Sequence, residues 1–114
     1  MDETALRSAG IDYDAALARF VGRRELYEKF LQKFLEDTHE QDAVRAYQEQ
    51  KFDEMLAQVH ALKGVCGTLG LTKLYEISAA IVKDLRAEEF AGLESRMEQL
   101  TEEYDKLCEA IRKA

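Results

Sequence analysis

Apolar side chains recur at alternating spacings of three and four residues along most of this 114-residue chain, and no proline interrupts them. An α-helix has about 3.6 residues per turn, so this spacing gathers the apolar side chains on one helical face. Alanine, leucine, glutamate, lysine, glutamine and arginine dominate the composition, and these residues lose least on entering a helix. The pattern therefore predicts an all-α fold.

The apolar faces predict four long helices, preceded by one or two short helical pieces. The long faces fall in four segments of the chain: 26–47, 55–69, 74–85 and 90–111. We expect the first helix to continue or kink through Tyr47, and Asp53 to cap the second. Short pieces are expected over residues 2–8 and after Asp12, which is placed as a cap. Amphipathic helices with short connections favour an up-and-down antiparallel four-helix bundle, formed by residues 1–114 as a single domain.

The charge balance argues against two classes of partner. The chain has 23 acidic and 16 basic residues, which gives a formal net charge of -7. Nucleic acids and anionic membrane surfaces are bound through basic groups, so we expect neither as a partner. No apolar run approaches the roughly 20 residues of a membrane span, and the N-terminus lacks the basic and apolar regions of a signal peptide. We expect a cytoplasmic protein whose cysteines, Cys66 and Cys108, are buried and reduced.

The helix expected over residues 53–69 carries two stripes of different character. The first is apolar and faces the core: Met55, Val59, Leu62, Cys66 and Leu69. The second holds a histidine, a lysine and two glycines at relative positions i, i+3, i+4 and i+7: His60, Lys63, Gly64 and Gly67. On a helical wheel the centres of the two stripes lie about 120° apart. We therefore expect His60 to be exposed beside the core face, next to an ammonium group and two residues without side chains.

Gly64 and Gly67 are unfavourable inside a helix and therefore need a reason. Each interior glycine costs a helix about 1 kcal/mol relative to alanine, or about 2 kcal/mol for the pair. Close packing against a neighbouring helix is one explanation, because small residues permit it. The other is that a partner approaches the imidazole of His60 closely, and side chains at these positions would block it. Glycines on the polar face around a histidine favour the second explanation.

His60 and Lys63 indicate phosphoryl chemistry. A neutral imidazole presents one ring nitrogen as a nucleophile, and an ammonium group one turn away can reach phosphoryl oxygens as a mobile point charge. Phosphoryl transfer needs mainly positioning and charge stabilisation, with the attacking and leaving atoms in line. The chain has no P-loop and no obvious carboxylate cluster for magnesium near His60. We therefore expect it to accept and donate a phosphoryl group without drawing one from ATP, and to bind no cofactor itself.

The same segment resembles a known family signature. The pattern His-x-x-Lys-Gly-x-x-Gly-x-x-Gly, typical of histidine phosphotransfer domains, is matched by five residues: His60, Lys63, Gly64, Gly67 and Gly70. Three upstream segments resemble the opening of the form found at the C-terminus of hybrid sensor kinases: 10–12, 16–20 and 26–31. The resemblance covers about residues 10–87, and the last helix matches only in pattern.

The resemblance implies a role for each of these residues. It implies a four-helix bundle in which His60 carries the phosphoryl group on its outward ring nitrogen and Lys63 stabilises the charge of that group. Receiver domains are the implied partners, docking over Gly64 and Gly67, with a histidine kinase as a further candidate. The Mg²⁺ ion and the acyl phosphate then come from the receiver. We accordingly expect a monomeric phosphorelay intermediate that takes a phosphoryl group from one receiver aspartate and passes it to another.

Two alternatives remain open from the sequence. The N-terminal phosphotransfer domain of chemotaxis-type histidine kinases shares the His-x-x-Lys-Gly-x-x-Gly core, although the upstream segments resemble the hybrid-kinase form. A helical bundle used only for binding, with an inert histidine, would have no need of Lys63 and both glycines. The second histidine, His39, has no such neighbours and is predicted to be a surface residue. Both a complete small protein and a piece of a hybrid kinase are compatible with the sequence.

Overall fold

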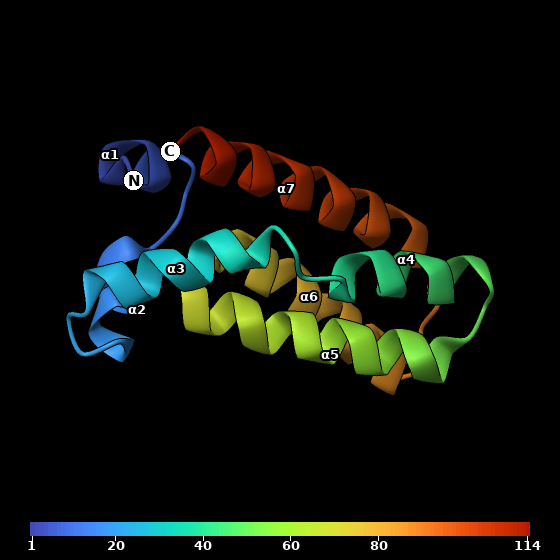
Figure 1. Ribbon diagram of the computed structural model, residues 1–114. Coiled ribbons are helices and arrows are strands. Elements are labelled where there is room, and N and C mark those ends of the chain that lie inside the picture. The colour runs from blue at the N-terminus through green and yellow to red at the C-terminus, as the bar shows by residue number, and fades with distance from the viewer.

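The computed structural model describes residues 1–114 and is built from α-helices, with no β-strand (Figure 1). The helices follow one another in the order α1 (Glu3–Ser8), α2 (Tyr13–Arg19), α3 (Arg24–Phe34), α4 (His39–Gln48), α5 (Phe52–Leu69), α6 (Thr72–Arg86) and α7 (Leu93–Lys113). Their apolar faces enclose one core, which includes the whole predicted apolar stripe of α5 and both cysteines. None of the helices is long and apolar enough to cross a membrane. The predicted all-α fold is confirmed.

The bundle has four antiparallel members. The first member consists of two successive helices, and each of the other three is a single helix. α3 and α4 follow one another along the bundle, and both pack against α5 and α7. α5, α6 and α7 then run alternately back and forth beside them, as Figure 1 shows. The short helices lie at one end, where α1 packs on α7 and α2 packs on α5. This arrangement confirms the predicted up-and-down bundle with two short helical pieces before it.

The first long helix of the prediction is two helices, because the chain leaves the helix at residues 35–38. The N–H groups of Leu35, Glu36 and Asp37 each donate to the carbonyl three residues earlier, at 3.1, 2.9 and 3.1 Å, which tightens and ends α3. Asp37 Oδ1 then accepts a hydrogen bond from the backbone N–H of His39 at 2.9 Å, where α4 begins. A side chain that satisfies a backbone donor in this way competes with helix continuation. The apolar pattern runs across this break, so the sequence predicted a continuous or kinked helix.

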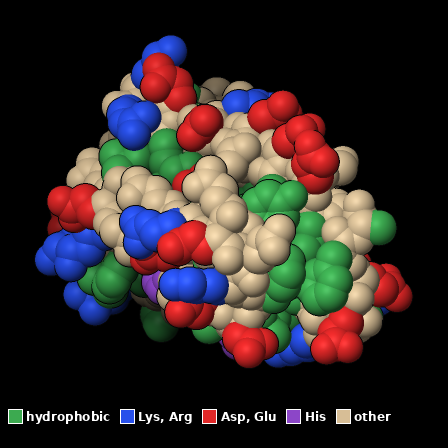
Figure 2. Space-filling model, turned by 90° about the vertical axis from the view of Figure 1, so that its right-hand side faces the viewer, with side chains coloured by type: hydrophobic (Ala, Val, Ile, Leu, Met, Phe, Trp, Pro, Cys, Tyr) green, Lys and Arg blue, Asp and Glu red, His purple; other side chains and the backbone are tan.

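Two predicted boundaries were wrong. Asp53 lies inside the first turn of α5, and the residue before the helix, Lys51, makes no side-chain cap. Phe90 precedes α7 and is 43 % exposed, so it does not belong to the apolar face of that helix. Its ring stacks on the ring of Phe52, with the centroids 4.5 Å apart. Figure 2 shows that hydrophobic side chains reach the surface at this end of the bundle.

The turn between α5 and α6 holds α2 in place. Gly70 ends α5 in the left-handed conformation, with φ +76°, and its carbonyl accepts a hydrogen bond from the N–H of Asp12 at 2.8 Å. Asp12 caps α2 as predicted, because its carboxylate accepts the N–H of Ala15 at 3.2 Å. The neighbouring residues Ile11 and Leu71 form an isolated antiparallel bridge. Gly70 therefore determines both the end of α5 and the position of α2.

Candidate functional site

His60 is exposed to solvent near the middle of α5, as the stripe pattern predicted. Its core-side neighbours, Val59 and Leu62, are fully buried, which fixes the rotation of α5 and so turns the His60 position outward. Of the two histidine rings, the one that contacts a carboxylate is that of His39. The imidazole of His60 therefore makes no ion pair with a carboxylate of the protein and is accessible to a reactant.

The other potential nucleophiles near His60 are buried or already engaged. Cys66 is fully buried in the core, and burial raises the pKa of its thiol far above the ordinary value, so the reactive thiolate is suppressed. Thr68 is exposed, but its hydroxyl donates a hydrogen bond to the carbonyl of Gly64 at 3.1 Å. His60 is consequently the side chain on this face that is best suited to nucleophilic attack.

Lys63 lies one helical turn after His60, on the neighbouring part of the helix surface. The residue is half-buried. The ion pairs of the lysine side chains involve Lys51, Lys73, Lys106 and Lys113, so the ammonium group of Lys63 is unpaired. It is therefore available to an anionic group that approaches the imidazole.

The two glycines of the stripe have different surroundings. A Cβ atom at Gly64 would meet nothing within 4 Å, so this position is open space beside His60. A Cβ atom at Gly67 would lie 3.3 Å from Cε2 of Tyr75, a residue of α6. The space beside Gly67 is thus partly taken by an aromatic ring, and close packing accounts for a glycine there. No neighbouring atom accounts for the glycine at position 64.

Gly64→Ala is expected to stabilise the fold by up to about 1 kcal/mol, because alanine is the better helix former and its methyl group meets no neighbour. Gly67→Ala should gain less, since the ring of Tyr75 must move by a few tenths of an ångström to make room. Denaturant unfolding of the two variants beside the parent protein measures the difference. A large loss of stability in Gly64→Ala would show that this glycine serves helix packing after all.

An open groove, lined mainly by apolar residues, lies between α3 and α5 from Ala61 onward and has a volume of about 630 Å³. Its α5 wall consists of Ala61, Gly64, Val65, Thr68 and Leu69. Its opposite wall comes from the end of α2, from α3 and from the break that follows α3: Phe20, Phe30, Lys33, Phe34 and Asp37. The groove therefore joins the open position at Gly64 to an aromatic surface on α3.

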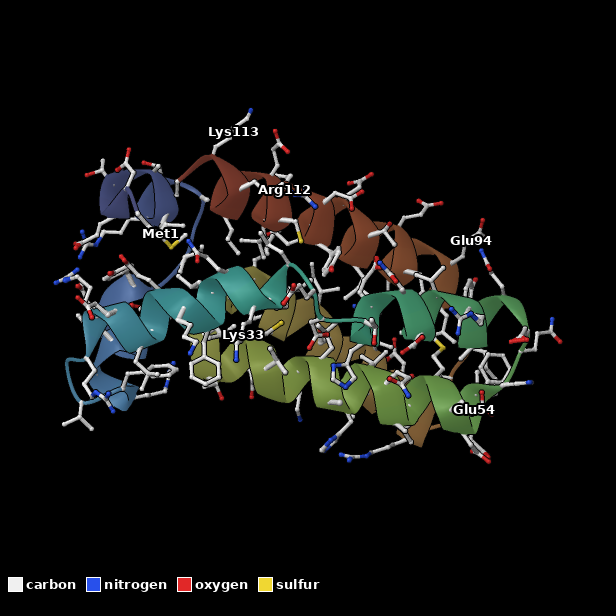
Figure 3. The ribbon with its side chains drawn as sticks, viewed as in Figure 1. Met1, Lys33, Glu54, Glu94, Arg112 and Lys113 are labelled. Atoms are coloured by element: carbon white, nitrogen blue, oxygen red, sulfur yellow. The ribbon has the colours of Figure 1, made fainter.

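Phe30 and Lys33 were not identified as surface features from the sequence. Phe30 belongs by its spacing to the apolar face predicted over residues 26–47, but it is 41 % exposed, so its assignment to that buried face was wrong. The ammonium group of Lys33 lies 5.6 Å from the centroid of the Phe30 ring, and Figure 3 places Lys33 between α3 and α5. The spacing of Phe30 alone could not reveal this, because the exposure of a side chain also depends on how its helix packs against the neighbouring helices.

The structure also gives His39 a partner that the sequence did not indicate. Its ring Nδ1 lies 2.9 Å from Asp37 Oδ1, and the ring is half-buried at the start of α4. The same carboxylate accepts the backbone N–H of His39, so Asp37 is engaged twice by one residue. No group of three His, Cys, Asp or Glu side chains in the structure is arranged to hold a metal ion.

One comparison with known proteins gives a match that covers every residue of the stripe on α5. A family model described as the Hpt domain matches residues 25–110, which include α5 with His60, Lys63 and both glycines of the stripe. Searches of curated proteins and of solved structures give no match. The matched region spans the four antiparallel members of the bundle and leaves out α1 and α2.

Proposed function

The chain belongs to the histidine phosphotransfer (Hpt) family, and on that premise we propose that it is a phosphorelay intermediate acting through His60. In this proposal His60 accepts a phosphoryl group from an aspartate of one receiver domain and passes it to an aspartate of another. The observation that carries the proposal is the exposed imidazole, which lies one turn from an unpaired ammonium group and beside open space at Gly64. That space lets the acyl phosphate of a receiver approach the ring.

The proposed transfer is a substitution at phosphorus. The lone pair of one imidazole nitrogen attacks the phosphorus atom, and the bond from phosphorus to the aspartyl oxygen breaks in line with the attack. The carboxylate leaves with the electron pair, and the product is a phosphoramidate on His60. In the second transfer a carboxylate of another receiver attacks the same phosphorus and the imidazole leaves. The ring keeps the proton on its other nitrogen, so His60 returns to its starting state.

We expect the Mg²⁺ ion of this reaction to be held by the receiver. Magnesium prefers carboxylate and carbonyl oxygens, whereas the side chains beside His60 provide an ammonium group. The protein then needs no cofactor of its own and has no means of using ATP directly. We also expect it to act as a cytoplasmic monomer, and its net charge of -7 favours protein partners over nucleic acid or anionic membrane.

Incubation with a phosphorylated receiver domain and Mg²⁺ tests the proposal. We expect the protein to gain one phosphoryl group that is labile in acid and stable in base, as a phosphoramidate on imidazole is. Incubation with ATP and Mg²⁺, without a kinase or receiver, should give no labelling. If no receiver encoded in the same genome transfers a phosphoryl group, the inert binding bundle becomes the better interpretation.

Lys63→Ala is expected to slow transfer without preventing it. One charge-assisted contact to the phosphoryl oxygens is worth on the order of 1–3 kcal/mol in the barrier, or roughly 5- to 150-fold in rate. Single-turnover transfer from a phosphorylated receiver measures the change. Lys106→Ala on α7 is the matched control and should leave the rate unchanged, because Lys106 lies on another helix beside Glu103. Equal rates for both variants would remove Lys63 from the mechanism.

A further inference from the structure

We propose that the end of the bundle opposite the chain termini is a second binding surface, which takes a basic amphipathic segment of a partner protein. Its centre is the stacked pair of Phe52, at the start of α5, and Phe90, in the turn before α7. Figure 1 shows both chain termini at the other end of the molecule. His60 lines neither of the hollows at this surface, so the inference goes beyond the proposed phosphoryl transfer.

Two hollows flank the stacked rings of Phe52 and Phe90. One has a volume of about 640 Å³ and is continued by Leu56 and Leu85, and the other has a volume of about 350 Å³ and is bordered by α4 and the start of α7. Figure 2 looks onto this end of the bundle and shows a hydrophobic patch with acidic side chains around it. An exposed apolar patch with a polar rim is typical of a site of protein interaction.

The charge of this end is strongly negative. Residues 47–56 and 84–94 form its two turns and the adjoining helix ends, and they hold seven acidic and two basic residues, which gives a net charge of -5. The whole chain has a net charge of -7, so most of its negative charge gathers here. Figure 3 labels Glu54 and Glu94 at this end.

The carboxylates that line the larger hollow are not neutralised by the fold. Three of them form no ion pair with a basic residue of the chain: Asp53, Glu54 and Glu88. The basic residue that lines the hollow, Lys51, is paired with Glu49 at 3.8 Å. The hollow therefore offers an apolar centre with free negative charge on its rim.

An acidic rim around an apolar centre favours one class of partner. The carboxylates attract lysine and arginine side chains, and the rings with their hollows accept apolar side chains. A helix with an apolar stripe and basic residues beside it offers both. A two-fold contact with a second copy is disfavoured, because it sets the same surface, with its charge of -5, against itself. The occupant is therefore a partner segment of opposite charge.

The backbone of both turns supports a role for the side chains there. Gln50 and Glu88 each follow a helix in the left-handed conformation, with φ 56° and 55°, which glycine adopts at a lower cost. In each turn the N–H of the next residue donates to the carbonyl five residues earlier, at 2.8 Å for Lys51 and 2.9 Å for Glu89. Gln50 and Glu88 both line the larger hollow. The chain therefore keeps side chains beside the proposed site at two positions where glycine would give a more stable turn.

Synthetic amphipathic peptides test the proposal on the full chain. One set carries leucine at helical spacing with lysines beside it, and a matched set carries glutamate in place of each lysine. Titration followed by fluorescence anisotropy should show that the lysine set binds roughly tenfold or more tightly than the glutamate set. The difference should shrink as salt is added. Shifts of the Phe52 and Phe90 ring resonances in NMR spectra should locate the bound peptide.

Two variants with matched controls separate the apolar contribution from the charge. Phe90→Ser should weaken binding of the lysine peptides by roughly tenfold, whereas Phe30→Ser, at a residue 41 % exposed on α3, should leave it unchanged. Glu88→Gly should weaken binding several-fold and also raise the denaturant concentration at the midpoint of unfolding, since glycine relieves the left-handed turn. Glu76→Gln removes an exposed carboxylate of α6 outside the hollow and should change neither property.

Equal binding of the lysine and glutamate sets, or no binding of either set, would overturn the assignment. Unchanged binding of the lysine peptides in Phe90→Ser would overturn it as well. Analytical ultracentrifugation of the parent protein and Phe90→Ser examines the other occupant, because self-association that is lost in the variant would make a second copy of the chain the partner instead. Phosphoryl transfer to His60 from a receiver should proceed at the parental rate in Phe90→Ser, so the proposed function is tested separately from this surface.

Discussion

Replacement of His60 by glutamine is expected to abolish phosphoryl transfer while the bundle stays folded. Glutamine is polar and a good helix former, and the side chain of residue 60 is exposed, so stability should change by less than about 0.5 kcal/mol. Transfer should fall below detection, because the nearby alternatives are the buried thiol of Cys66 and the engaged hydroxyl of Thr68. Acid-labile labelling from a phosphorylated receiver, with circular dichroism on the same sample, measures both properties.

His39→Gln is the matched control for this experiment. It removes the other imidazole of the chain, whose contact is with Asp37 rather than with a reactant. Transfer should therefore continue at the parental rate, with a small loss of stability from the missing ring contact. Phosphate that persists in His60→Gln would move the acceptor to another residue. Loss of labelling in His39→Gln would show that the ring beside Asp37 takes part in the chemistry.

The core and the exposed face of α5 that carries His60 could be predicted from the sequence because both follow from helical periodicity. Once Val59 and Leu62 are assigned to the core, the 3.6-residue repeat leaves one orientation for His60 and Lys63. The same reasoning explains why the all-α bundle could be predicted from the chain. These features depend on the spacing of residues within single helices, and that spacing can be counted in the sequence.

The features that could not be predicted depend on pairs of segments. The break between α3 and α4 needs the hydrogen bond from the His39 N–H to the carboxylate of Asp37, which the apolar pattern does not record. Phe30 has the spacing of a core residue, yet it is exposed in the groove, whose two walls come from segments far apart in the sequence. The difference between Gly64 and Gly67 likewise arises from a residue of another helix, Tyr75. Each of these features depends on how one segment packs against another.

Gly70→Ala is expected to produce the largest loss of stability among single changes at the glycines. Its backbone is left-handed, with φ +76°, which costs a residue with a side chain about 1–2 kcal/mol. A Cβ atom there would also lie 2.5 Å from the carbonyl oxygen of Asp12 and 3.1 Å from Cβ of Ala16. Both neighbours belong to the segment that packs α2 onto α5, so α2 must move away. With that packing disturbed, the total loss should reach about 3–5 kcal/mol.

Gly10→Ala separates the two causes of this loss. Gly10 is also left-handed, with φ +90°, but a Cβ atom there would meet nothing within 4 Å. Gly10→Ala should therefore lose only the backbone contribution to stability, about 1–2 kcal/mol. The difference in unfolding free energy between the two variants then measures the clash against α2. Denaturant unfolding monitored by circular dichroism gives both free energies, and transfer to His60 should persist in whatever fraction of Gly70→Ala stays folded. Equal losses of stability in the two variants would mean that α2 can move away from the added methyl group without a loss of free energy. Gly70 would then serve only to end α5.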